Sequence, residues 1–215
     1  MLTRANDMVW ALRTVTPLLP AQTGNLDGLA HTLWLPPPPQ PAPRAGIVVI
    51  HGADSAKESH HDFARAAVAL GFAVICFDQR GHGETGGALG SGAGPVRDVV
   101  TMAGRLRAAL GRADAPIALR GSSMGGYLAI RAAGPTRASA VVAICPASGE
   151  GLRRGLDEGR FDFAADEAPL RAFLDAEDLT ATVASLTAPL LLMHAEGDER
   201  VPVEHSRELA AVMRA

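Results

Sequence analysis

Residues 116–133 read PIALRGSSMGGYLAIRAA: a short apolar run, a serine between glycines, and an apolar helix-forming segment. The run predicts a buried strand, and the residues from the serine onward predict a helix. Between them stands Gly-x-Ser-x-Gly, from Gly121 to Gly125. A chain that turns this sharply accepts only glycine two positions before and after the serine, and it exposes the hydroxyl. We therefore interpret Ser123 as a nucleophile, with a glycine-rich packing turn as the alternative. Ser122, the rival in register, lacks glycines at both flanking positions.

The same alternation of apolar runs and helix-forming segments extends in both directions along the chain. It predicts right-handed crossover units, and hence an α/β fold with a mostly parallel central sheet and helices on both faces. Ser59 is expected to cap the first of these helices. The predicted strands cover 47–50, 72–77, 116–120, 140–144 and 189–194, and the predicted helices cover 59–70, 95–110, 123–133 and 203–213.

The first 45 residues look irregular, apart from one apolar segment. Residues 29–35 predict an edge strand, and residues 36–43 form a proline-rich tract. Proline cannot donate to a sheet ladder, so this tract is expected to be an exposed connection. A polyproline ligand for a partner domain is the alternative that its composition leaves open.

Length and composition describe one soluble domain, residues 1–215, with a formal charge of −3. A net negative charge does not favour binding to nucleic acid, which is itself negatively charged. No apolar stretch is long enough for a membrane span. Asn6, Asp7 and Arg13 interrupt any signal-peptide segment, so a cytoplasmic location is expected. The two cysteines, Cys76 and Cys145, stand in apolar runs and are expected to be inert core thiols.

Chemistry in a parallel sheet is expected beyond the carboxyl ends of the strands. The strand over 47–50 ends in His51-Gly52-Ala53-Asp54. A tetrahedral intermediate on Ser123 would need two N–H donors, and the backbone of Ala53 and of Met124 can supply them. The imidazole of His51 is expected to orient this loop rather than to react.

These motifs resemble the α/β-hydrolase superfamily, in order and in spacing, from about residue 28 onward. The resemblance is closest to serine esterases and to lysophospholipase- or peptidase-like members with a small cap. The matching segments are IVVIHG at 47–52, FDQRGHGET at 77–85, LRGSSMGGYLA at 119–129 and LLLMHAEGDERVP at 190–202.

The resemblance implies a role for particular residues. It maps the nucleophile onto Ser123, the oxyanion donors onto Ala53 and Met124, and the triad acid onto Asp198 rather than Glu196. It also implies that residues 149–186 form a small lid or cap that selects the substrate. No cofactor and no metal are implied, and the partners are small ester or amide substrates.

A histidine should follow the acid as general base, and only His205 does so in this sequence. We expect His205 to be an ordinary surface residue, so the chain is expected to be C-terminally truncated or to lack its base. A missing last strand would leave a sheet edge uncovered, which predicts reduced stability or pairing with another chain, as in a homodimer. The other histidines are expected to be structural: His31, His51, His60, His61, His82 and His194.

The predicted function is hydrolysis of small carboxylic esters through an acyl-enzyme on Ser123. Two alternatives stay open: an amide or peptide hydrolase of the same fold, and an inactive member that acts only as a binding module. A phosphate-binding role for the glycine-rich segment 81–94 is unsupported, because the segment lacks Gly-Lys-Ser/Thr.

Overall fold

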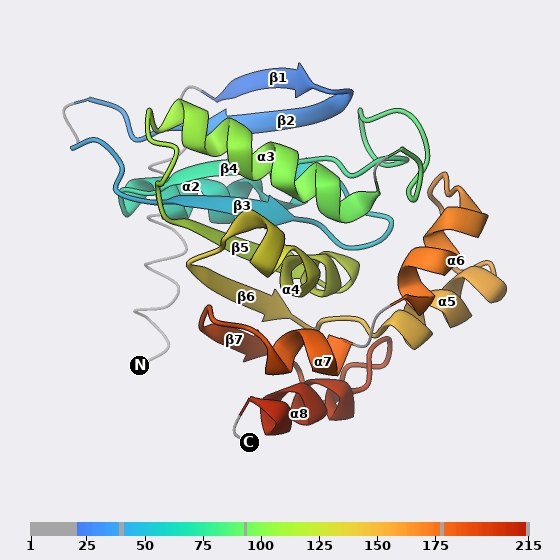
Figure 1. Cartoon of the computed structure of the whole chain (residues 1–215). Helices are drawn as coiled ribbons and strands as arrows, with labels where there is room; N and C mark the ends of the chain where they lie inside the picture. The colour runs from blue at the N-terminus through green and yellow to red at the C-terminus, as the bar shows by residue number, and fades with distance from the viewer. Residues whose placement is uncertain (1–20, 39–40, 93, 177–178, 214–215) are drawn as a thin grey trace.

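A seven-stranded sheet, drawn from top to bottom in Figure 1, organises the chain in this computed structural model. The structure describes residues 21–38, 41–92, 94–176 and 179–213; Asn6, Asp7 and Arg13, and part of the proline tract, lie outside these ranges. The sheet order is β1-β2-β4-β3-β5-β6-β7. The strands are β1 (Gln22–Leu26), β2 (Leu29–Trp34), β3 (Gly46–Ile50), β4 (Ala73–Phe77), β5 (Ile117–Ser122), β6 (Ala140–Ile144) and β7 (Leu190–Met193).

Strands β3 to β7 pair in parallel, which confirms the predicted mostly parallel sheet. Strand β4 is buried along its whole length because both of its faces are covered. Its alternate side chains enter two separate cores: Ile75 and Phe77 lie in the larger one, and Val74 and Cys76 in the smaller one. This division follows from the two-residue period of a strand.

Helices cover both faces of the sheet, as predicted (Figure 1). Helix α2 (His61–Ala69) packs on one face, against β4 and β2. Helices α3 (Pro95–Ala109), α4 (Met124–Thr136) and α7 (Leu179–Ala184) pack on the other face. Helix α4 is buried along almost its whole length, which explains why its sequence is so uniformly apolar.

Two local predictions near the N-terminal side are wrong. The segment over 29–35 is not an edge strand, because β2 lies between β4 and an additional strand, β1. Ser59 does not cap a helix: it lies within a 3-10 turn, η1 (Lys57–His60), and its hydroxyl donates to the carbonyl of Ala56. The regular helix begins only at His61.

At the other side of the sheet, β7 is the last strand of the described chain. It pairs with β6 alone, and its side chains alternate between half-buried and exposed. Leu191 and Met193 are 55% and 49% exposed, among the largest apolar exposures in the described residues. Helix α8 (Val203–Val212) packs beside β7 and α7.

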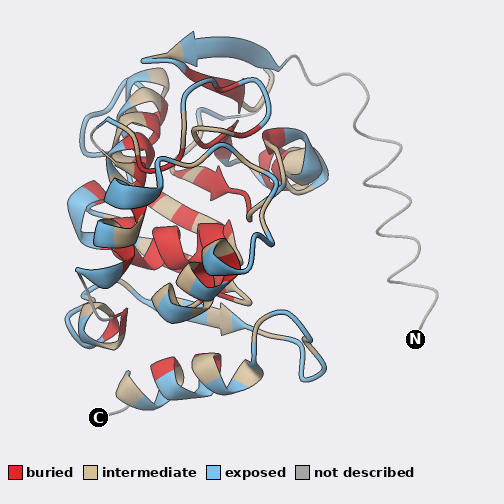
Figure 2. Cartoon of the chain, turned by 90° about the vertical axis from the view of Figure 1, so that its right-hand side faces the viewer, coloured by how far each residue is buried: buried red, intermediate tan, exposed pale blue. Residues whose placement is uncertain are grey.

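Two helices stand beyond the carboxyl ends of the strands: α5 (Gly149–Asp157) and α6 (Glu167–Asp175). Figure 2 looks onto these ends and shows exposed outer helical surfaces around a buried centre. We call residues 149–175 the cap. Within the predicted 149–186 segment, α7 contacts α4 and α8 rather than standing with α5 and α6. No helix of the described ranges is both long and apolar enough to cross a membrane.

Candidate active site

Ser123 lies at the turn between β5 and α4, where the motif places it. Its φ of +53° and ψ of −119° are unusual for a residue with a side chain. The turn is fixed from both sides, because the Ser123 N–H donates to the Ile144 carbonyl and the Ser123 carbonyl accepts from the Ala147 N–H. Strained backbone that is held this firmly is typical of functional positions.

The two glycines of the motif are required by packing. A Cβ on Gly121 would collide with the backbone of Gly125, and a Cβ on Gly125 would collide with the carbonyl groups of Ile50 and His51. Helix α4 therefore starts in direct contact with the end of β3. This contact brings the loop that follows β3 against the serine.

That loop carries one of the two backbone donors proposed for an oxyanion, Ala53, and the start of α4 carries the other, Met124. A Cβ built on Gly52 would lie 3.3 Å from the Cβ of Ser123, so the loop passes immediately beside the serine. Met124 is the first residue of α4, and its N–H has no partner within the helix. The N–H groups of Ala53 and Met124 thus belong to the two segments that flank Ser123.

His51 holds this loop in place. Its Nδ1 donates to the Gly52 carbonyl over 2.7 Å, and its Nε2 accepts from the Gln79 N–H over 3.0 Å. The side chain is fully buried, and burial lowers its pKa to about 4. The ring is therefore neutral and committed at both nitrogens, in agreement with the predicted structural role.

Asp198 lies in the loop after β7, with one carboxylate oxygen anchored. Its Oδ1 accepts from the N–H groups of Arg200 and Val201, each at 2.9 Å. The bond from Val201 contributes most to lowering the pKa of this carboxyl below its usual value. The side chain is 19% exposed and ionised at neutral pH. Its other oxygen, Oδ2, lies 3.7 Å from His194 Nε2.

The sequence did not predict that His194 lies beside Asp198. The ring is packed, with its Nδ1 accepting from the Ser206 hydroxyl (2.7 Å) and its Nε2 donating to the Val201 carbonyl (2.9 Å). Cys145 joins them: one ligand atom from each of Cys145, His194 and Asp198 lies within 4.8 Å of the other two. We call these three residues the Cys-His-Asp cluster.

Only one of the two cysteines is a core thiol. Cys76 is fully buried on β4, as predicted. Cys145 is half-buried and follows β6 with a φ of +44°, so the predicted core position is wrong for it. Burial, followed by a hydrogen bond to the Asp198 carboxylate, raises the pKa of its thiol, whereas a nucleophilic cysteine needs a lowered pKa.

The remaining histidine after the acid, His205, lies in the first turn of α8. Its ring bonds to the backbone of Ala147, and burial lowers its pKa. Its Nε2 is buried without a hydrogen-bond partner. His205 is therefore packed against the segment that supports Ser123, and it is not the ordinary surface residue that the sequence predicted. In the described ranges no histidine hydrogen-bonds to the Ser123 hydroxyl.

The only lysine in the sequence, Lys57, ties together the loops that follow β3 and β4. Its ammonium lies 2.8 Å from Asp78 and 2.6 Å from Glu84, and its side chain is 3% exposed. Burial opposes the charge, but bonds to Asp78, Glu58 and Glu84 outweigh it and raise the Lys57 pKa. The three carboxylates that could together hold a metal ion, Glu58, Asp78 and Glu84, thus already share one ammonium group.

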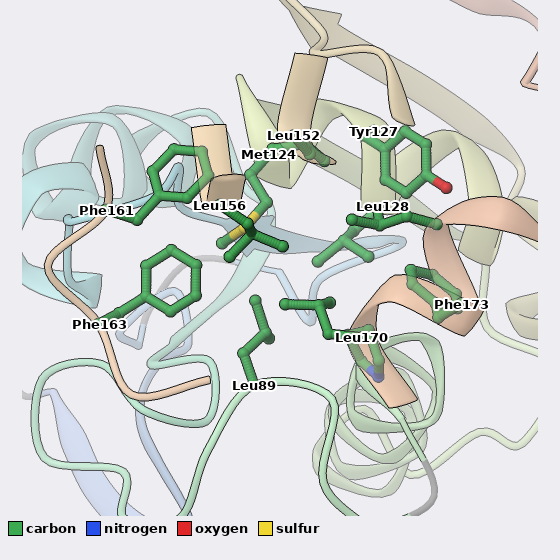
Figure 3. A pocket seen from close by; sticks show the side chains of 12 residues that line it. Leu89, Met124, Tyr127, Leu128, Leu152, Leu156, Phe161, Phe163, Leu170 and Phe173 are labelled. Carbon is green, nitrogen blue, oxygen red and sulfur yellow. The ribbon is translucent and has the colours of Figure 1, made fainter. Parts of the chain in front are cut away.

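An apolar pocket lies between α4 and the cap (Figure 3). Its empty space is about 310 Å³, counting the part that is open to solvent, and the side chains fill most of its interior. The pocket is lined by Met124, the residue that follows Ser123 in the chain. Its lining residues are Leu89, Pro95, Met124, Tyr127, Leu128, Leu152, Leu156, Phe161, Phe163, Leu170, Phe173 and Leu174.

Aromatic rings connect the cap to the loops at the strand ends. The His82 ring stacks on Phe163 with a centroid distance of 4.4 Å, and Phe163 stacks on Phe161 at 5.3 Å. On its other side, His82 lies 4.9 Å from the His51 ring. The cap is therefore joined to the loop beside Ser123 through two histidines and two phenylalanines.

The fold and the serine turn define the chain as a member of the α/β-hydrolase superfamily. Residues 41–157, more than half of the sequence, match the family model described as serine aminopeptidase, S33, so the chain belongs to this family. A fungal relative, the hydrolase pyiE of Pyricularia grisea, is 34% identical over 141 residues. That alignment covers 60% of this chain and 30% of the length of the relative.

Solved structures show the same fold at low identity. An acylaminoacyl peptidase from Pyrococcus horikoshii has a TM-score of 0.71 at 17% identity, covering 97% of this chain and 36% of that chain. An esterase from Pyrococcus furiosus has a TM-score of 0.70 at 20% identity, covering 95% and 81%. A monoacylglycerol lipase from Paleococcus ferrophilus has a TM-score of 0.65 at 20% identity, covering 87% and 85%.

Proposed function

We propose that this chain is a serine hydrolase that cleaves small carboxylic esters through an acyl-enzyme on Ser123. The observation that carries the proposal is the position of Ser123: a positive-φ turn between β5 and α4, with the loop after β3 packed beside it. A half-buried serine at a helix N-terminus can attack a carbonyl carbon once a base removes its proton. The N–H groups of Ala53 and Met124 then stabilise the oxyanion.

Asp198 is the proposed acid of the triad, and its role is to orient the histidine that serves as base. Its anchored carboxylate and lowered pKa support this role, because the acid must stay ionised while the imidazole becomes charged. His194 is a poor base for Ser123, since both of its ring nitrogens are engaged. His205 keeps one buried nitrogen without a partner, but no described contact joins it to Asp198 or to Ser123.

The pocket beside Met124 supports an apolar substrate group. Its lining is entirely apolar apart from the tyrosine hydroxyl, so an alkyl or aryl acyl group would be favoured over a charged one. Because the pocket is nearly filled, substrate entry requires the cap side chains to move outward.

The proposal is tested by a fluorophosphonate probe, which reacts with activated serines. The full chain should be labelled, Ser123→Ala should not, and Ser122→Ala, one residue away on β5, should be labelled like the parent. Labelling of Ser123→Ala would assign the reactivity to another serine. No labelling of the folded parent protein would favour the inactive binding module.

The same probe tests the base. His205→Ala and His194→Ala are compared with the parent at equal protein concentration. Loss of labelling in His205→Ala alone would assign the base to His205, whereas unchanged rates in both variants would exclude both histidines.

The amide-hydrolase alternative draws on the description of the matched family as serine aminopeptidases. It is distinguished by pairs of substrates that share one acyl group, such as p-nitrophenyl butyrate and the corresponding p-nitroanilide. A higher kcat/KM for the ester in the parent, lost in Ser123→Ala, is the expected result.

A further inference from the structure

We infer that Asp54 is a positioning residue, through which an apolar acyl group in the pocket directs the proposed oxyanion donor, the Ala53 N–H. The inference rests on the proposed function and adds the residue that links the cap to the reacting centre. Asp54 follows Ala53 in the chain, and its Oδ1 accepts a hydrogen bond from the Asp162 N–H of the cap over 2.7 Å. We call residues 51–57, which follow β3, the oxyanion loop.

The oxyanion loop is held firmly at both of its ends. At its start, the carbonyl of His51 accepts a bond from the side-chain amide of Gln79 over 2.7 Å. At its end, the Lys57 N–H donates to the buried Asp78 carboxylate over 2.7 Å. In the middle of the loop, the hydrogen-bond partner that the described residues provide from outside is the Asp162 N–H. The cap contact therefore lies where the direction of the oxyanion donor is not yet fixed by the two anchors.

On the cap side, Asp162 lies between two phenylalanines that line the pocket. The rings of Phe161 and Phe163 both stand beside the pocket in Figure 3. The same cap segment lies against the loop that follows β4, where a Cβ on Gly81 would collide with the carbonyl oxygen of Ala164. An acyl group that packs against the two rings therefore restrains the backbone between them, which donates to Asp54.

This contact allows binding energy from the acyl chain to act at the reacting carbon. Interactions with remote parts of a substrate can be used for orientation, and shortened substrates then lose kcat and not only affinity. The rings rotate to admit a long acyl chain and then pack on it, which keeps the bond to Asp54 and directs the Ala53 N–H. An acetyl group offers no chain to pack against the rings, so it leaves the loop as it is in the free protein.

The backbone of Asp54 allows the hydrogen bond to be removed without disturbing the turn. Its φ of +57° is left-handed, a conformation that glycine adopts freely and that asparagine and aspartate tolerate. Asp54→Gly therefore keeps the turn and removes the acceptor, whereas Asp54→Asn keeps both. Asp54 is exposed, so neither substitution leaves a cavity in the core. In the cap, Asp162→Ala removes a side chain but keeps the N–H that donates to Asp54.

Hydrogen exchange followed by NMR, with octanoate as the probe, tests the coupling without requiring catalysis. In the full chain, octanoate should slow the exchange of amides 161–163 in the cap and of amides 53–55 in the oxyanion loop. The slowing in the loop should be roughly fivefold, the factor expected for one hydrogen bond. Asp54→Gly should keep the protection of the cap and lose that of the loop. Asp54→Asn and Asp162→Ala should behave like the parent.

Ester kinetics test the catalytic consequence. In the parent, kcat for p-nitrophenyl octanoate should exceed kcat for p-nitrophenyl acetate, and Asp54→Gly should lose this difference while Asp54→Asn keeps it. Removing an oxyanion donor outright costs roughly 100- to 1,000-fold in kcat, so loosening one should cost at least about tenfold with the octanoate ester.

Three results would overturn the inference: no protection of the loop by octanoate in the parent, protection that persists in Asp54→Gly, or an equal loss of kcat for both esters, which a merely structural role would give. If the parent hydrolyses neither ester, the proposed function fails, and the exchange measurement still decides the coupling.

Discussion

At the scale of single residues, Gly125 is required because its neighbours leave no space for a side chain, and not because its backbone needs a positive φ. Gly125 presses against the carbonyl groups at the end of β3, so any side chain there separates α4 from the sheet. Gly134, near the other end of the same helix, has open space around its Cβ position. Gly134 is therefore the matched control for Gly125, because both lie in α4 and only Gly125 lacks space for a side chain.

We predict that Gly125→Ala lowers the free energy of unfolding by about 1–3 kcal/mol or more, as overpacking does in a close-packed interior. Gly134→Ala should leave it unchanged or raise it by about 0.5–1 kcal/mol, because alanine is the better helix former. Urea denaturation followed by circular dichroism measures both. Equal effects of the two substitutions would contradict the packing argument.

The residues of the Cys-His-Asp cluster show what a sequence leaves hidden. The turn around Ser123 is a local pattern of five residues, so it could be predicted directly. Cys145 and His194 are far apart in sequence and meet only because β6 and β7 pair in parallel, with Ile144 opposite Met193. Cys145 and His194 each follow the last residue of their strand, so the pairing register brings them side by side. Neither strand's own sequence determines that register.

At the scale of secondary-structure elements, burial decides what could be predicted. Strands β3 and β4 are apolar throughout because helices cover both sheet faces, and their predicted ranges agree with the structure. Strand β1 reads QTGNL, is largely exposed and carries no apolar alternation, so its sequence gave no signal. Once β1 is missed, β2 looks like the edge of the sheet.

The cap is the element whose attachment can be measured. Phe163 stacks between His82 and Phe161, and an aromatic pair contributes about 0.5–1.5 kcal/mol beyond its buried area. We predict that Phe163→Leu accelerates hydrogen exchange of cap amides by roughly tenfold, since about 1.4 kcal/mol corresponds to that factor.

Hydrogen exchange of the amides in β3 to β6 should stay unchanged in Phe163→Leu, because the packing of these strands does not depend on the Phe163 ring. Phe72→Leu is the control, since Phe72 is 38% exposed and precedes β4, away from the cap. Faster exchange throughout the protein, or no change in the cap, would refute a local role for the stack.

At the scale of the whole molecule, the exposed apolar side chains of β7 predict self-association. A second copy related by a two-fold axis would pair β7 with β7 and continue the sheet, covering Leu191 and Met193 in both copies. Light scattering after size-exclusion chromatography should then show a mass that rises toward the dimer with concentration.

Met193→Lys should return the protein to a monomer, because pairing of β7 with β7 would bring a charged ammonium group against apolar side chains of the second copy. Leu70→Lys provides the control. Leu70 is 78% exposed, but it follows α2, which packs on β4 and β2, and three strands separate β4 from β7 in the sheet. A parent protein that stays monomeric at all concentrations would refute the prediction.

Lys57 has a consequence for labelling chemistry. It is the only side-chain amine in the chain, and three carboxylates surround it in a buried setting. Acylating reagents that target amines should therefore leave the folded side chain intact and modify it only as the protein opens. A single mass increment at Lys57 thus becomes a reporter of unfolding that mass spectrometry can read without any engineered residue.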